Sequence, residues 1–94
     1  MAYVVNTGNS KCARLKPVSL ESVKLTDNFW AKKIEIMEKV TLPTQYEILE
    51  ETHRIDNFRR ASGKISGEFV GFFFNDSDVY KWIEAVSYLL AYKN

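Results

Sequence analysis

Apolar side chains recur at three- and four-residue steps over the last part of the chain, and this spacing constrains the fold more than any other feature. The steps match the period of about 3.6 residues of an α-helix, so these side chains share one face that must pack against another surface. We predict a helix from about residue 78 to residue 92, with Asp76 or Ser77 as its N-terminal cap. Its apolar face carries Val79, Trp82, Ile83, Val86, Leu89 and Leu90.

Two further helices are predicted upstream, so we expect a mainly α-helical fold. Asp27 can accept hydrogen bonds from the free amides at the start of a helix from about residue 28 to residue 40. Pro43 ends that pattern and can open a second helix that runs to about Thr52. The inner face of the first of these helices carries Phe29, Trp30, Lys33, Ile34, Met37 and Val40.

The start of the chain shows no helical pattern. Residues 1–17 contain turn-forming residues and end at Pro17, and we interpret them as a flexible leader. Residues 18–20 and 23–25 alternate apolar and polar side chains, which predicts a short extended segment with one or two brief strands. The fold class predicted from these patterns is therefore mainly α, with a short extended segment near the N-terminus.

Charged side chains on the predicted helices can form ordinary ion pairs. Glu50 lies four residues before Arg54, and Lys81 lies three residues from both Asp78 and Glu84. Such pairs account for the acidic cluster on the second helix without catalysis. That cluster consists of Glu47, Glu50 and Glu51.

A glycine-containing loop and three consecutive phenylalanines precede the last helix. Gly63, Gly67 and Gly71 are interpreted as turn residues. We name Phe72, Phe73 and Phe74 the phenylalanine triplet; it is too apolar to remain in water, so we expect it to enter a core or to line a pocket wall.

Composition excludes several function classes. With 46% apolar and 27% charged residues, the 94-residue chain is not of a disordered type and forms at most one small unit. A net charge of +1 argues against a nucleic-acid partner. No run of residues fits a secretion signal or a membrane span, so we expect a cytoplasmic protein with no membrane partner. Cys12 and His53 are single, so we predict no catalytic residue and no metal site within the chain.

The segment of residues 72–84 resembles a signature of the family-127 glycoside hydrolases. The resemblance continues upstream, so it covers nearly everything from about residue 20 onward. The similar positions are residues 23–30, residues 42–43 with Tyr46 and Leu49, residues 54–58 and residues 67–71.

The resemblance implies a β-L-arabinofuranosidase, whose body is an (α/α)6 barrel followed by β-sandwich domains. Residues 18–94 would then be the N-terminal part of the catalytic domain, and the chain would be a fragment that contributes the opening helices of the barrel. The family is understood to use a cysteine nucleophile at a zinc site and a glutamate as general acid and base. None of those residues corresponds to a position in this chain, so we expect the fragment alone to be inactive.

The resemblance also suggests which residues contact an arabinofuranoside, because loops that open barrel helices line the substrate cleft. The predicted substrate-binding residues are Asn57, Phe74, Asp76, Asp78 and Tyr80. Backbone bracing, capping and packing are the alternative roles of these side chains.

Two other functions remain open from the sequence. A stand-alone helical interaction module would bury Trp30, the phenylalanine triplet and Trp82 against one another, whereas a carbohydrate-binding module would expose them on one face. Helix faces that lack a partner would also favour self-association of the chain.

Overall fold

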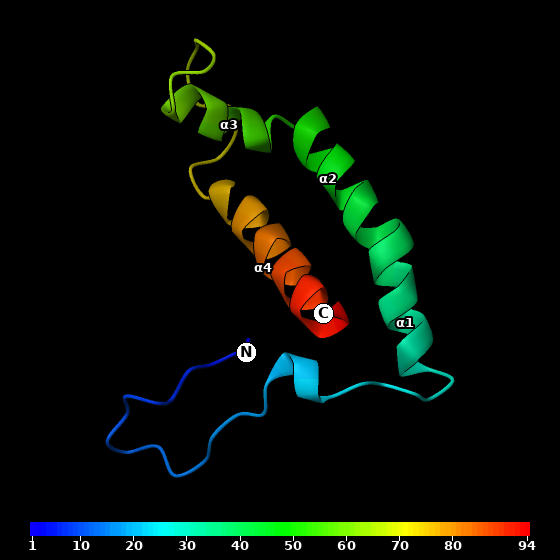
Figure 1. Ribbon diagram of the computed structural model, residues 1–94. Coiled ribbons are helices and arrows are strands. Elements are labelled where there is room, and N and C mark those ends of the chain that lie inside the picture. Colours follow the sequence, from blue (N-terminus) through cyan, green and yellow to red (C-terminus); the bar gives the residue numbers. More distant parts are fainter.

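The computed structural model describes residues 1–94 and contains helices joined by loops, with no strands (Figure 1). The mainly helical class predicted from the sequence is confirmed. The brief strands predicted near residues 18–25 are wrong, because a strand needs a partner and a 3₁₀ turn is formed here instead. The elements in chain order are η1 (Leu20–Ser22), α1 (Trp30–Ile36), η2 (Met37–Thr41), α2 (Leu42–Glu51), α3 (Arg54–Ala61) and α4 (Asp76–Lys93).

The start of the chain is attached to η1 by hydrogen bonds. The amide of Ala2 donates to the Glu21 carboxylate at 2.8 and 3.1 Å, and the amide of Leu20 donates to the carbonyl of Ala2 at 2.8 Å. Residues 1–17 therefore form a loop whose two ends meet at η1. The flexibility expected of this segment stays a prediction.

Asp27 organises the start of α1, as the sequence predicted. Its carboxylate accepts hydrogen bonds from the amides of Phe29, Trp30 and Ala31, at 3.0, 2.7 and 3.0 Å. These amides have no helical partner, so the carboxylate satisfies them and also lies at the positive end of the helix dipole. The same hydrogen bonds, with that of Trp30 the strongest cause, lower the pKa of Asp27.

Pro43 lies in the first turn of α2, which ends at Glu51, as predicted, but the expected break between the two helices is absent. The helix runs without interruption from α1 through the π-helical turn η2 into α2, and the amide of Leu42 bonds to the carbonyl of Met37. A proline ring inside an α-helix collides with the carbonyl four residues earlier, here that of Lys39. Here the π turn comes directly before the proline, and the helix continues through it.

α4 lies alongside α2, and the small apolar core sits between them (Figure 1). Leu42, Leu49 and Val79 are the only buried apolar side chains. The indole of Trp82 on α4 donates to the carbonyl of Leu42 on α2 at 2.9 Å, so this hydrogen bond joins the two helices. The helix predicted from residue 78 to residue 92 is therefore confirmed, and it begins two residues earlier, at Asp76.

α3 turns away from α2 at His53, which has a left-handed backbone with φ of 61°. The loop after α3 returns the chain to the start of α4 (Figure 1). Gly63, Gly67 and Gly71 all have positive φ, at 78°, 122° and 94°, which confirms their predicted role as turn residues.

The arrangement is open. The radius of gyration is 17.2 Å, whereas a compact domain of this length has about 12 Å. The accessible surface is 7569 Å², compared with about 5,600 Å² for a compact protein of this mass. Each chain therefore exposes roughly 2,000 Å² more than a compact fold would. None of its helices reaches the length and apolarity that crossing a membrane requires.

Candidate functional site

The predicted substrate-binding residues lie around the start of α4, with the exception of Asn57 on α3. Phe74 precedes the helix, Asp76 and Asp78 are in its first turn, and Tyr80 follows in the next turn. Neither aspartate forms a side-chain cap; the residue at the cap position is Asn75. The sequence thus predicts the start of α4 correctly, but neither predicted cap, Asp76 or Ser77, is at the cap position, and no side chain forms a cap hydrogen bond there.

Asn57 is buried, with 5% of its surface exposed, and its side chain forms three hydrogen bonds within the chain. Its amide nitrogen donates to the carbonyl of Val70, and its oxygen accepts from the amide of Val70, both at 2.9 Å. The guanidinium of Arg60 donates to the same oxygen at 3.1 Å. This pair of backbone bonds ties the glycine loop to α3. The predicted contact of Asn57 with a sugar stays a prediction.

The phenylalanine triplet lies in solvent, so the prediction that it enters a core is wrong. Phe73 is 88% exposed, and the other two rings are more than half exposed. Phe72 and Phe74 stack with centroids 5.3 Å apart and an interplanar angle of 5°, and Phe73 meets Phe74 edge to face. The rings cover one another because no helix of the 94 residues lies over this loop.

Tyr80 and Asp76 have polar groups that make no hydrogen bond within the chain. The Tyr80 side chain is 57% exposed, and its ring meets Phe58 edge to face at 5.8 Å between centroids. Packing therefore fixes the ring, while the hydroxyl is directed to solvent. This hydroxyl can donate to or accept from the hydroxyl groups of a sugar, and the carboxylate of Asp76 can accept hydrogen bonds from them.

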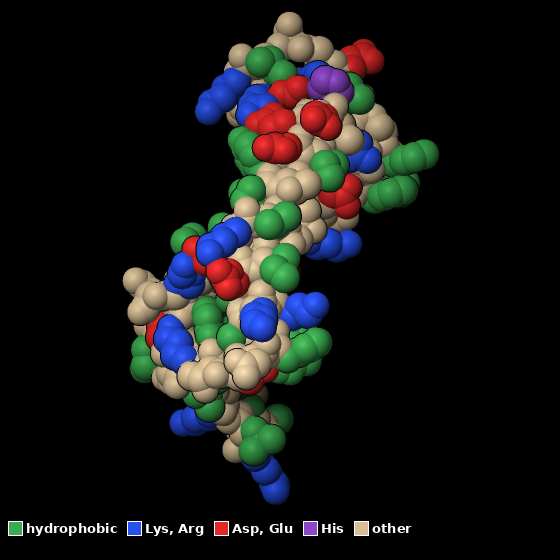
Figure 2. All heavy atoms as spheres, turned by 90° about the vertical axis from the view of Figure 1, so that its right-hand side faces the viewer, with side chains coloured by type: hydrophobic (Ala, Val, Ile, Leu, Met, Phe, Trp, Pro, Cys, Tyr) green, Lys and Arg blue, Asp and Glu red, His purple; other side chains and the backbone are tan.

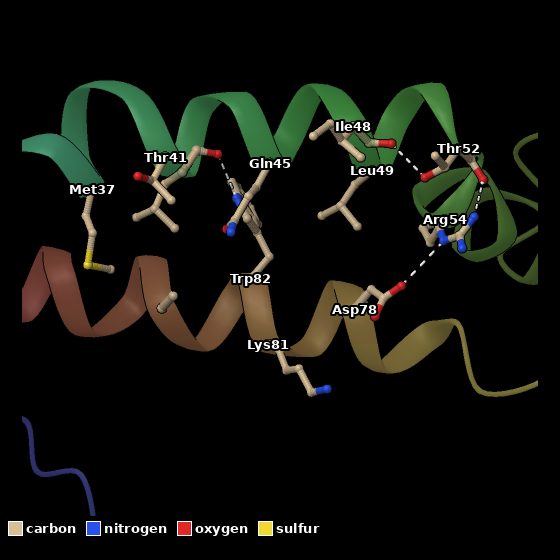
Figure 3. A pocket seen from close by; sticks show the side chains of 12 residues that line it. Met37, Thr41, Gln45, Ile48, Leu49, Thr52, Arg54, Asp78, Lys81 and Trp82 are labelled. Atoms are coloured by element: carbon tan, nitrogen blue, oxygen red, sulfur yellow. Dashed lines mark hydrogen bonds and ion pairs between the residues drawn. The ribbon is translucent and has the colours of Figure 1, made fainter.

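A groove of about 570 Å³ runs between α2 and α4 (Figure 3). One end is polar: Arg54 Nε lies 3.4 Å from Asp78 Oδ2, and the guanidinium also donates to the carbonyl of Thr52 at 3.0 Å. The volume lies in the range of small-molecule sites. The lining side chains include Met37, Leu42, Gln45, Ile48, Leu49 and Trp82.

Two ion pairs predicted from the sequence are absent at this groove. Asp78 pairs with Arg54, so neither the Glu50–Arg54 pair nor the Lys81–Asp78 pair is formed. In Figure 3 the Lys81 side chain points away from α2, and it makes no ion pair with Glu84. A pair between residues 24 apart in sequence carries no local signal. The four-residue spacing of Gln45 and Leu49 on α2 could have indicated the groove itself.

Glu50 instead belongs to a charged network at the corner between α2 and α3. Arg59 holds both oxygens of Glu50 at 2.6 Å and also donates to Asp56 at 2.8 Å. Tyr46 donates its hydroxyl to Glu50 at 2.9 Å, and His53 Nδ1 lies 3.0 Å from the second oxygen of Asp56. Figure 2 shows acidic and basic side chains gathered around the single histidine at this end of the molecule.

This network favours the ionised form of Glu50, which argues against Glu50 as a general acid. The bonds from Arg59, and then the bond from Tyr46, lower the pKa of Glu50. The bond to His53, and then the bond to Arg59, lower the pKa of Asp56. A general acid needs a raised pKa, so carboxylates held ionised in this way are suited to structure rather than to proton donation.

The zinc site implied by the family resemblance does not fit the residues present. No group of three or more histidine, cysteine, aspartate or glutamate side chains is placed to hold a metal ion. Cys12 is exposed in the N-terminal loop, while His53 is bound to Asp56 at the α2–α3 corner.

Comparison with known proteins identifies the family. No solved structure matches the chain. A non-reducing end beta-L-arabinofuranosidase from Bifidobacterium longum subsp. longum is 29% identical over an aligned length of 90 residues, gaps included; the alignment covers 76% of this chain and 14% of that relative. The model of the family described as beta-L-arabinofuranosidase, GH127 catalytic domain, matches residues 22–94. Since this match covers most of the sequence and agrees with the segments that carried the resemblance, the chain belongs to the GH127 catalytic-domain family.

Proposed function

We propose that residues 22–94 form the opening helices of an (α/α)6-barrel catalytic domain in a protein that hydrolyses terminal β-L-arabinofuranosides. The observation that carries this proposal is the family match over residues 22–94. The relative from Bifidobacterium longum has that activity by name, and the chain spans 14% of its length. A cytoplasmic location is the corresponding expectation from the sequence.

In this proposal α1, η2, α2 and α4 are scaffold, and the start of α4 forms part of the rim of the sugar site. Asp76 and Tyr80 supply the unused carboxylate and hydroxyl, with Phe74 beside them as an apolar surface for the sugar ring. Asp78 is engaged by Arg54 and fixes the first turn. Asn57 positions the loop through its two bonds to Val70.

The 94 residues alone are expected not to hydrolyse arabinofuranosides. The chain places no zinc ligand set. The bonds from Arg59 and Tyr46 lower the pKa of Glu50, and those from His53 and Arg59 lower the pKa of Asp56, so neither carboxyl is suited to proton donation. Turnover of p-nitrophenyl β-L-arabinofuranoside by the purified chain would refute the scaffold role.

A chimera tests the proposal. The matching segment of the Bifidobacterium relative is replaced by residues 22–94, and hydrolysis of p-nitrophenyl β-L-arabinofuranoside is measured. We expect activity to be retained, and Asp76→Ala and Tyr80→Phe to lower kcat/KM by about tenfold or more, because each removes a hydrogen bond to the sugar. Glu35→Ala, on the solvent side of α1, is the control and leaves kcat/KM unchanged. A folded chimera with unchanged helicity and no hydrolysis would contradict the assignment.

A carbohydrate-binding role without catalysis is favoured by one specific observation, the exposure of the phenylalanine triplet. Exposed rings can stack on the apolar face of a sugar. NMR titration of the chain with L-arabinofuranosides tests this role, and Phe73→Ala is expected to weaken binding. The interaction-module alternative has less support, because Trp30 and the triplet are not buried against Trp82.

A further inference from the structure

α4 has apolar side chains on two sides. One side packs on α2, whereas the other stays more than half exposed at Ile83 and Leu90, although η1 and α3 also contact α4. Trp82 and Leu89 are on the side that faces α2, and Val79 is buried. Figure 1 shows α2 on one side of α4 and no helix on the other. A helix that is apolar on both sides is typical of an interior position. We name this exposed side the outer stripe; it consists of Tyr80, Ile83, Ser87 and Leu90, and the Tyr80 ring at its upstream end also meets Phe58 of α3.

The outer stripe has the chemistry of a helix–helix contact. Tyr80, Ile83 and Leu90 are 57%, 52% and 65% exposed. With Ser87 they follow the alternating three- and four-residue spacing of a coiled-coil seam. The Ser87 hydroxyl donates to the carbonyl of Ile83 at 2.7 Å, so its polar group is already satisfied by its own helix. The seam therefore carries no charge and no free polar donor apart from the tyrosine hydroxyl.

We propose that the outer stripe of α4 binds the outer stripe of a second copy of this chain, with the two helices antiparallel. An antiparallel pair centred near Ala85 places Ile83 opposite the small Ser87 of the other copy, and Tyr80 opposite Leu90. Ile83 then meets the small Ser87 near the two-fold axis, and Tyr80 meets Leu90 farther out. The same pairs recur on both sides of the axis, as a symmetric dimer requires.

Surface area and charge support a second copy as the occupant. A standard interface takes about 800 Å² from each partner, and the outer stripe is one part of the roughly 2,000 Å² that the whole chain exposes beyond a compact fold of its mass. α4 has acidic residues in its first turn and Lys93 in its last, so antiparallel helices bring opposite charges and opposite dipole ends together. Lys93 also contacts Glu38 of its own chain, and its side chain is still 48% exposed.

The occupied surface is the outer stripe rather than the groove between α2 and α4. The groove ends at the Arg54–Asp78 pair, so an apolar partner would have to remove water from charged groups there. The stripe positions themselves impose no such cost. The inference concerns the 94-residue chain itself and does not depend on the glycosidase assignment.

Sedimentation equilibrium of the purified chain over a range of concentrations tests the proposal. We expect the mass to rise from that of the 10.9 kDa chain to twice that value. Ile83→Glu and Leu90→Glu should each raise the dissociation constant on the order of a hundredfold or more, because a dimer would bury two unpaired carboxylates. Both residues are exposed in the single chain, so helicity measured by circular dichroism should not change.

The matched control is Ile36→Glu on α1, where an isoleucine of similar exposure, 49%, lies away from the stripe. It should leave the dissociation constant unchanged. A wild-type chain that stays monomeric at every concentration would overturn the proposal. So would an equal loss of association in the Ile36 and Ile83 variants, because it would place the contact elsewhere.

Discussion

Replacement of Asn57 by alanine is expected to release the glycine loop from α3. The side chain makes three hydrogen bonds, two to the backbone of Val70 at 2.9 Å and one from Arg60 at 3.1 Å. A net value of about 0.5–1.5 kcal/mol for each bond gives a loss of about 2–4 kcal/mol in the free energy of unfolding. For a chain of this size the melting temperature should fall by roughly 10–30 °C.

Urea unfolding followed by circular dichroism measures the loss, at one fixed protein concentration because association would add to the apparent stability. Hydrogen exchange of the Val70 amide gives a local measurement, and its protection should disappear in Asn57→Ala.

Asn75→Ala is the matched control for this prediction. Asn75 is equally buried, at 3% exposed, but its amide nitrogen has no hydrogen-bond partner. Its removal should change the free energy of unfolding by no more than about 1 kcal/mol. Equal losses in the two variants, with Val70 still protected in Asn57→Ala, would refute the reasoning, because burial rather than hydrogen bonding would then stabilise the loop.

Three other substitutions test local features. Gly71→Ala should lower the free energy of unfolding by about 1–3 kcal/mol more than Gly63→Ala in urea unfolding, because both have positive φ but only the first new Cβ would lie 2.2 Å from a buried amide nitrogen. Because the pKa of Glu50 is lowered in the folded chain, its ionised form stabilises the fold at pH values above the ordinary pKa of 4.5, and this contribution is lost as the pH falls through the lowered pKa. The melting temperature of the Arg59→Met variant should therefore depend less on pH below about 5 than that of the wild type. Asp27→Ala should speed hydrogen exchange of the first amides of α1, while Asp27→Asn, which keeps an acceptor, should do so less.

Features set by neighbouring residues could be predicted from the sequence. The spacing of Val79 and Trp82 predicted α4, because a face of a helix is defined by residues three and four apart. Asp27 was recognised as a cap because its carboxylate reaches amides within four residues. The turns at Gly63 and Gly71 followed from the preference of glycine for positive φ.

Features that depend on distant residues could not be predicted. Pro43 was expected to end a helix, yet the helix continues through a π turn, and the indole of Trp82 bonds to Leu42 beside it. The Arg54–Asp78 pair at the end of the groove joins residues on different helices. The left-handed backbone of His53 directs α3 so that Arg59, rather than Arg54, reaches Glu50. None of these contacts has a signal within one helical turn of sequence.

An apolar face in a sequence shows only that some surface covers it, and two surfaces compete for the outer stripe of α4. In the isolated chain a second copy is the proposed partner. In the chimera with the Bifidobacterium relative, the remainder of the catalytic domain is available to cover the same stripe. Ile83→Glu should therefore prevent dimer formation in the isolated chain and also lower the melting temperature of the chimera, whereas Ile36→Glu should do neither.

The two measurements separate the two proposals. A chimera that tolerates Ile83→Glu, together with an isolated chain that loses its dimer, would show that the stripe faces solvent in the complete domain and is an interface between copies only. A chimera that unfolds with Ile83→Glu would show that the dimer uses a face that belongs to the interior of the catalytic domain.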